Sequence, residues 1–253
     1  MKKHISYSEL KTWAECPFKR KLSYQDRVKE FTGNAFTAFG RALHFLCEKL
    51  VFDKVEDPED FFNLSFEKEL AGAGVEEDDL VKSMRDQAQL ITPQIMPELT
   101  KIFGDYQVFS VEEQLYQPIK DSNTGHNFKG FIDLVIHTKD GKFHIIDWKT
   151  CSWGWDAKKK ADKYITYQLT LYKKFWCEKY EIDPNLVETH FALLKRTAKK
   201  DNVEIFRVTS GPRKVENATK LLTNALIHIS KQHHVKDRRA CRNCEFYKTK
   251  HCK

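Results

Sequence analysis

The chain has 253 residues, enough for one large domain or two small ones with a substantial core. Lysine and arginine number 43 against 36 aspartates and glutamates, and the net charge of +7 favours a polyanionic partner. No stretch approaches about 18 consecutive apolar residues, which excludes a transmembrane helix and predicts a soluble, cytoplasmic protein without membrane contact. Because internal repeats and low-complexity linkers are absent, residues 1–253 are expected to form a single domain.

The opening residues carry a helix start signal. Ser6 and Glu9 have the spacing of a capping box, which predicts a helix that begins at Ser6. The helix should break near Cys16 and Pro17, leaving Cys16 at a corner. Further on, residues 53–105 predict a helical insertion, to which we assign no chemistry.

A second helix is expected over residues 34–52, with an apolar stripe along one face. Gly40 lies one turn before His44, and its missing side chain would let another backbone approach closely. A single histidine beside an apolar stripe is usually structural. His44 therefore becomes a site candidate only if carboxylates face it.

Residues 128–150 form the most informative stretch of the chain. Two apolar, β-branched runs flank an Asp-Gly turn, which predicts an antiparallel hairpin. Asp133 interrupts the first run, and Asp147 and Lys149 end the second. Since side chains alternate across a strand, Asp147 and Lys149 should project from the same face.

The register of this hairpin decides whether Asp133 joins that face. A two-residue turn would set Asp133 against a tryptophan, whereas the three-residue loop Lys139-Asp140-Gly141, with Gly141 left-handed, sets it against Asp147. We expect the second register. Paired carboxylates about 5 Å apart at Cβ repel unless a cation lies between them, which suits Mg²⁺ or Mn²⁺. The alternative is a surface ion pair and a frayed strand end.

Two tryptophans and three lysines follow the hairpin. Trp153, Trp155 and residues 158–160 suit base stacking beside phosphate neutralisation, although a solvated loop is the competing interpretation. The helix expected at 156–180 places Gln168 and Tyr172 one turn apart on the face that should pack on the sheet. There they would lie near the carboxylates, or simply form the edge of the core.

The remaining pattern completes an α/β fold. Further strands are expected at 106–119, 187–195 and 203–208, and a last helix at 212–231. This order predicts a mixed central β-sheet flanked by helices, with the sheet core in residues 106–209.

Seven cysteines are better explained by metal binding than by disulfides in a reducing compartment. Cys241, Cys244 and Cys252 supply three thiolates at chelating spacing, and Cys16 is the natural fourth ligand. Four thiolates suit either an iron–sulfur cluster or zinc.

Several of these motifs occur together in one known family. In chain order they are Gly40-x₃-His44, Gly130-Phe131-Ile132-Asp133, Asp147-x-Lys149 and Gln168-x₃-Tyr172. This pattern resembles the RecB-like branch of the PD-(D/E)XK nucleases, with their restriction-endonuclease-like core. The opening Ser6-x-Ser8-x-Leu10-x₂-Trp13-x₂-Cys16-Pro17, with the cysteine-rich tail, resembles the iron–sulfur members, including AddB-type and CRISPR-adaptation nucleases.

The resemblance implies a set of roles. Magnesium or manganese would be held by His44, Asp133, Asp147 and the Trp148 carbonyl. Lys149 would position and help deprotonate the attacking water, while Gln168 and Tyr172 would orient Lys149 or the DNA backbone. The implied activity is that of a DNA exonuclease in recombination, repair or processing. Its substrate would be single-stranded DNA or DNA with single-stranded ends, and a helicase or recombination protein would be its partner.

The resemblance also implies a [4Fe–4S] cluster on Cys16, Cys241, Cys244 and Cys252 that joins the two ends of the chain. The gap before Cys252 is longer than the family's usual spacing, so structural zinc remains the alternative. The competing function is a catalytically inactive, metal-stapled DNA-binding subunit of a recombination complex. A zinc-tail protein acting on something other than nucleic acid is a third interpretation.

Overall fold

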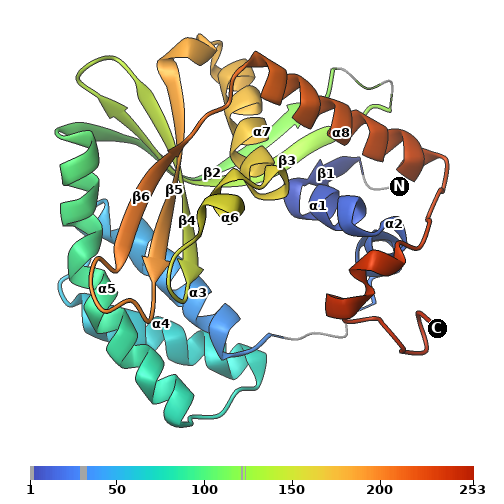
Figure 1. Cartoon of the computed structure of the whole chain (residues 1–253). Coiled ribbons are helices and arrows are strands. Elements are labelled where there is room, and N and C mark those ends of the chain that lie inside the picture. Colours follow the sequence, from blue (N-terminus) through green and yellow to red (C-terminus); the bar gives the residue numbers. More distant parts are fainter. Residues whose placement is uncertain (1–2, 29–32, 121, 123) are drawn as a thin grey trace.

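The computed structural model describes residues 3–28, 33–120, 122 and 124–253. Within them a six-stranded mixed sheet forms the centre of the molecule, with helices on both faces (Figure 1). The strands are β1 (His4–Ser6), β2 (Tyr106–Pro118), β3 (Asn127–Thr138), β4 (Phe143–Cys151), β5 (Val187–Lys195) and β6 (Val203–Val208). Their order is β1-β3-β4-β5-β6, and β2 also pairs with β3. The predicted mixed central sheet is confirmed.

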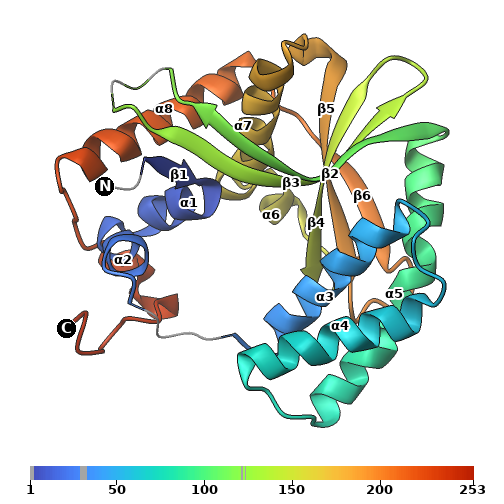
Figure 2. The ribbon, with the colours of Figure 1, turned by 180° about the vertical axis from the view of Figure 1, so that it is seen from behind.

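Two helical layers cover the sheet (Figure 2). The α7 layer consists of α1 (Tyr7–Glu15), α7 (Lys163–Tyr180) and α8 (Pro212–Ser230). The α3 layer consists of α3 (Ala35–Leu50), α4 (Pro58–Ala73) and α5 (Asp79–Phe103). Short helical segments complete the chain: α2 (Pro17–Arg20), η1 (Lys21–Gln25), α6 (Ala157–Ala161), η2 (Pro184–Leu186) and η3 (Arg238–Asn243). None of the described helices is long and apolar enough to cross a membrane.

The first helix begins and ends where its sequence signals place it. The Ser6 hydroxyl accepts the Glu9 backbone N–H at 3.2 Å and caps α1. At the other end, the extended backbone of Cys16 closes α1, and Pro17 opens α2 as its first residue. Cys16 therefore lies at a corner, as predicted.

Helix α3 packs closely on β4. Asn34 caps it in a reciprocal pair with Thr37. A Cβ at Gly40 would lie 3.2 Å from the Thr150 hydroxyl oxygen, so the close neighbour is a side chain of β4 and not the expected backbone. This contact brings His44, one turn further along α3, over the sheet.

The segment expected as an insertion forms most of one layer. Helices α4 and α5 share a core with the sheet residues Leu134, Ile146 and Ala192. Phe62 and Phe66 pack edge-on against Phe39 of α3. Residues 53–105 are therefore part of the main core and not an appendage to it.

The β3–β4 hairpin has the predicted three-residue register. Leu134 pairs with Ile146, and the loop closes with Gly141 in the left-handed region at φ 81°. Continuing this register by one residue sets Asp133 across from Asp147. The turn chemistry of the sequence was thus sufficient to fix which side chains meet.

Next to this pair, a short part of β3 has no strand partner along one edge. Along one edge of β3, residues 134–137 pair with β4 and residues 127–129 with β1, while residues 130–133 pair with neither. We call this opening the strand fork. Side chains two positions apart on a strand normally face the same side of a sheet. Ile132 packs in the α7 layer but Leu134 packs in the α3 layer, so the alternation of side chains along β3 reverses at the strand fork.

Two local expectations require correction. The helix predicted over 156–180 is divided into α6 and α7, because Asp162 is extended and caps α7 by accepting the Tyr164 N–H at 2.8 Å.

Strand β1 was not predicted. Three residues are too few to show alternation, and their partners begin at Asn127 in β3.

The tail after α8 returns to the start of the chain. The Phe18 N–H donates to the Val235 carbonyl at 3.1 Å, and the tail lies beside α2 in Figure 1. Segments from the two ends of the sequence thus share one side of the molecule.

Candidate active site

The strand fork places Asp133 among polar partners. Its Oδ2 accepts the Trp148 backbone N–H at 2.7 Å, in place of a ladder bond between the diverging strands. His44 Nδ1 lies 3.7 Å from the same oxygen. A carboxylate therefore faces His44, which was the condition for treating this histidine as a site residue.

Helix α7 contributes the opposite wall. Gln168 Nε2 donates to Asp147 Oδ1 at 2.9 Å and lies 3.3 Å from the Tyr172 hydroxyl. Lys149 Nζ lies 2.5 Å from Asp147 Oδ2, although that oxygen makes no hydrogen bond of good geometry. Gln168 of the predicted pair thus reaches the carboxylate on β4, while Tyr172 also belongs to the buried core of the α7 layer.

Gly130 is required by this packing. A Cβ at this position would lie 2.7 Å from Cε1 of Tyr172, closer than real Cβ atoms approach other atoms. The glycine in β3 therefore leaves the space in which the phenol ring sits next to the fork.

The two carboxylates conflict electrostatically. Burial, and then the charge of Asp147, raise the pKa of Asp133 well above its ordinary value. Burial also raises the pKa of Asp147, against the opposing effect of Lys149. Burial acts to lower the pKa of Lys149, but Asp147 and Asp133 outweigh it and the pKa rises. The lysine is therefore charged and partly neutralises a site with excess negative charge.

His44 is held in the neutral form that can donate a lone pair to a metal. Burial, reinforced by the charge of Lys149, lowers the pKa of His44 to about 4, while a hydrogen bond to the Trp148 backbone opposes the shift. At neutral pH the imidazole is consequently uncharged.

Glu112 is a neighbour that the sequence reasoning missed. It lies across from Asp133 on β2, with a left-handed backbone at φ 48° that is unusual for a glutamate. Burial, then Glu48 and Asp147, raise the pKa of Glu112. The signal available in the sequence was a pair of consecutive acidic residues, 112 and 113, inside a predicted strand.

The donor set at the fork fits a hard divalent cation. It combines carboxylate oxygens, a backbone carbonyl and one neutral imidazole, and both carboxyl groups have raised pKa values, as expected for groups that a cation would stabilise in the charged form. His44, Asp133 and Asp147 nevertheless do not form a group with all ligand atoms within 4.8 Å of one another. The Trp148 amide and the Lys149 ammonium hold the carboxylates in this arrangement.

The four predicted cysteine ligands line a single cavity of about 370 Å³. Cys16 lines it from one end of the chain, and Cys241, Cys244 and Cys252 line it from the other. The Cys16 sulfur accepts backbone N–H groups at 3.4 and 3.5 Å. The fold therefore brings all four thiols to one place.

The stretch after β4 is divided between core and solvent. Trp153 is 73 % exposed, whereas Trp155 packs edge-on against Phe191 in the α7 layer. Lys159 lies over the Trp155 ring, and Lys160 forms an ion pair with Glu204. The predicted stacking surface is thus reduced to Trp153 and Lys158, which is exposed.

Comparison with known proteins identifies the family of the chain. A family model of the PD-(D/E)XK nuclease superfamily matches residues 4–249. The chain therefore belongs to the PD-(D/E)XK nuclease superfamily, which implies a phosphodiester hydrolase that uses divalent metal ions.

Among solved structures, a candidate exonuclease from Eubacterium rectale is similar to the chain, with a TM-score of 0.61 and 13 % identity. The match covers 98 % of this chain and 88 % of the other. The protein SSO0001 matches with a TM-score of 0.48 and 12 % identity, over 97 % of this chain and 84 % of the other. No curated protein matches the chain.

Proposed function

We propose that the protein is a Mg²⁺- or Mn²⁺-dependent DNA exonuclease that acts in recombination, repair or processing of DNA. The observation that carries the proposal is the pair of carboxylates with raised pKa values beside Lys149: Asp147, which is buried, and Asp133, which is partly buried. Keeping such charges buried is costly, and a catalytic cation is the chemistry that explains them.

The ligands of the proposed metal site come from three elements, α3, β3 and β4. His44 would bind from α3, Asp133 from the fork, and Asp147 with the Trp148 carbonyl from β4. A bound Mg²⁺ or Mn²⁺ would stabilise charge on the scissile phosphate and favour ionisation of the attacking water.

Lys149 positions and helps deprotonate the attacking water in this proposal. Its pKa is raised by the two carboxylates against the lowering effect of burial. A bound cation would neutralise part of the carboxylate charge and so weaken its effect on the pKa of Lys149, whereas the effect of burial would remain. The pKa of Lys149 would therefore fall, which favours the neutral amine that can accept a proton.

Gln168 and Tyr172 act as positioning residues. The Gln168 amide holds Asp147 Oδ1, and the Tyr172 hydroxyl in turn lies next to that amide. Their removal should therefore disturb the orientation of Asp147 and Lys149.

We infer that the substrate is single-stranded DNA or DNA with single-stranded ends, supplied by a helicase or recombination partner. Exposed Trp153 follows Lys149 by four residues and offers a stacking surface for a base. Trp153→Ala should weaken single-strand binding about tenfold, while Lys200→Ala, at an exposed turn, serves as the control. Equal binding by both variants would remove Trp153 from the proposal.

For the cysteine cavity we propose a [4Fe–4S] cluster. The sulfurs of one tetrahedral zinc lie about 3.8 Å apart, from Zn–S bonds of about 2.3 Å. The cysteine-lined cavity of about 370 Å³ offers room for a cluster larger than a single ion. Protein purified anaerobically should be brown, and Cys16→Ala should lose the colour and about 4 kcal/mol of stability. Colourless protein with one zinc would replace the cluster with the zinc alternative.

The nuclease proposal is tested with end-labelled single- and double-stranded DNA, with and without Mn²⁺. The wild type should release nucleotides only with the metal, and Asp133→Asn should release none. Asp105→Asn, an exposed carboxylate that pairs with Lys139 at the start of β2, is the matched control. Metal-independent hydrolysis, or full activity of Asp133→Asn, would contradict the proposal.

A further inference from the structure

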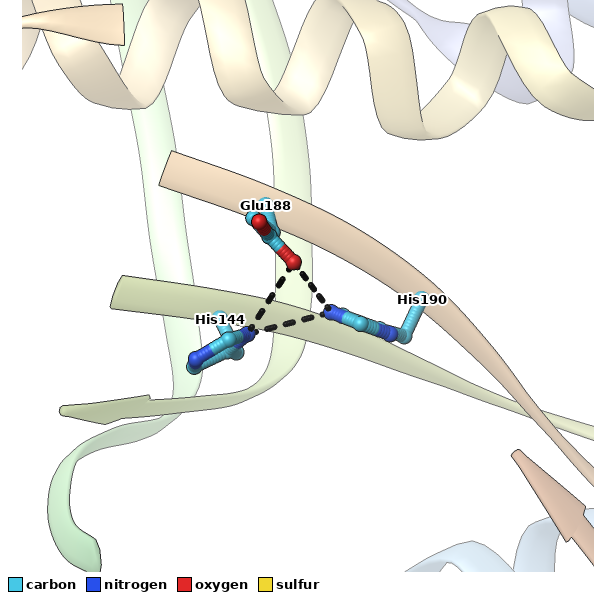
Figure 3. Close-up of side chains that lie close together, drawn as sticks. All are labelled: His144, Glu188 and His190. Carbon is cyan, nitrogen blue, oxygen red and sulfur yellow. Dashed lines mark hydrogen bonds and ion pairs between the residues drawn. The ribbon is translucent and has the colours of Figure 1, made fainter. Parts of the chain in front are cut away.

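Figure 3 shows a second group of side chains of the kinds that bind metal ions. It consists of His144 on β4 and of Glu188 and His190 on β5. The strands are parallel, and His144 pairs with Glu188 while Ile146 pairs with His190. All three side chains project towards the α3 layer, where Phe103 of α5 packs against both imidazoles at 4.9 and 5.0 Å between ring centres.

The distances in this group are close to those around one ion. His144 Nδ1 lies 3.1 Å from His190 Nε2, and Glu188 Oε2 lies 4.0 and 3.9 Å from these nitrogens. With metal–ligand bonds of about 2.0–2.1 Å, ligand atoms around a tetrahedral zinc lie about 3.3 Å apart. A shift of about 0.6 Å by the Glu188 carboxylate would complete this triangle.

Hydrogen bonding orients His144 as a ligand. Its Nε2 lies 3.1 Å from the Thr138 hydroxyl oxygen, and that hydroxyl donates its own proton to Asp140 Oδ1 at 2.5 Å. The hydroxyl can therefore only accept from His144, which places the imidazole proton on Nε2. The lone pair of Nδ1 then points into the triangle, as in histidines fixed by an outer hydrogen bond.

The other two members are also arranged for a ligand. Lys142 and Arg207 lie 3.2 Å from Glu188 Oε1, which leaves Oε2 for the histidines. His190 Nε2, the nitrogen that would bind the ion, faces His144 Nδ1 and Glu188 Oε2. The three ligand atoms therefore face one another from neighbouring strands.

We propose that His144, Glu188 and His190 bind one Zn²⁺ ion that joins β4 to β5, with solvent in the fourth position. Two imidazoles and a carboxylate suit zinc, whereas magnesium prefers oxygen ligands throughout. The site is separate from the nuclease site. His144 and Asp147 are three residues apart on β4, about 10 Å along the strand, and face opposite layers.

The proposal is tested by zinc content after the full chain is loaded with zinc and freed of weakly bound ions. Wild type and His137→Gln, a histidine outside the group at the same end of the sheet, should hold one more zinc per chain than His144→Gln. Glu188→Gln, which keeps the side-chain shape, should bind this zinc at least tenfold more weakly. Equal zinc content in these folded variants would overturn the site.

Two further measurements test the proposal even if one of these variants fails to fold. Zinc at about 100 times its Kd should raise the Tm of wild type by about 5–10 °C and leave that of Glu188→Gln unchanged. X-ray absorption of zinc-loaded wild type should show imidazole scattering. A sulfur-only shell, or equal Tm shifts in both proteins, would refute the proposal.

Discussion

Strand β4 carries two groups of potential metal ligands that differ in strand pairing and in charge. Asp147 lies where β4 has diverged from β3, and it is buried near a second carboxylate whose pKa is raised. His144 lies where β4 is paired on both sides, and the Glu188 carboxylate beside it is balanced by Lys142 and Arg207.

This difference is the basis for the two different roles that we propose. At the fork, unpaired backbone and two neighbouring carboxylates with raised pKa values support the proposed catalytic cation. At the His144 group, the paired strands and the Phe103 ring leave no comparable conflict. An ion there would add stability to the folded state without taking part in hydrolysis.

The largest expected effect is at Asp147. Asp147→Asn should lower DNA hydrolysis by about 10³-fold or more, because it removes a metal ligand and the partner of Lys149 while preserving shape. Single-turnover rates at saturating Mn²⁺ measure the loss. A reduction below tenfold would show that chemistry does not depend on the fork.

The next effect tests the packing of α7 on the fork. Gly130→Ala places a methyl group against Tyr172 and should lower the rate about 10- to 100-fold by displacing the phenol and Gln168. Gly72→Ala is the control, because a Cβ there meets no atom within 4 Å. Comparable rates for the two variants would argue against a positioning role for Tyr172.

A stability measurement tests the charge conflict directly. Because the folded-state pKa of Asp133 is raised, the metal-free protein should lose stability as pH rises above about 4 towards the raised pKa. Asp133→Asn should remove this dependence and raise Tm at pH 7 by about 2–4 °C, for about 1 kcal/mol. Thermal unfolding of wild type and Asp133→Asn in the presence of a chelator, from pH 4 to 8, gives the slope of Tm against pH for each protein. Parallel curves for variant and wild type would mean that Asp133 is not strained by its charge.

The smallest expected effect sharpens the contrast. His144→Gln should leave DNA hydrolysis within about twofold of wild type, because the hydrogen bonds of this side chain go to Thr138 and His190 and not to the proposed catalytic residues. The same assay as for Asp147→Asn measures it at saturating Mn²⁺. A large loss of rate would indicate that the two groups on β4 are coupled.

The features that could be predicted from sequence are those encoded over short distances. Gly141 selects the loop that fixes the hairpin register, and the spacing of Gln168 and Tyr172 places both on one helix face. Ser6 marks the start of α1 through a single local hydrogen bond.

The features that could not be predicted depend on pairing between distant segments. His144 and His190 are 46 positions apart and meet only because β4 and β5 are parallel neighbours. Glu112 reaches the fork through the β2–β3 register, and Trp155 enters the core through contacts with β5 and β6. Propensity and periodicity contain no information on these partners.

The shared location of the two ends of the chain also sets an order of events during synthesis. Cys16 contacts Asp237, which is 221 positions later in the sequence. At translation rates of about 5–20 residues per second, the Cys16 thiol must wait about 10–45 s for the segment that encloses it. Strand β1 likewise waits for β3. Cys16 is thus synthesised well before the segment that contacts it, and its thiol is open to oxidants or foreign metals throughout that interval.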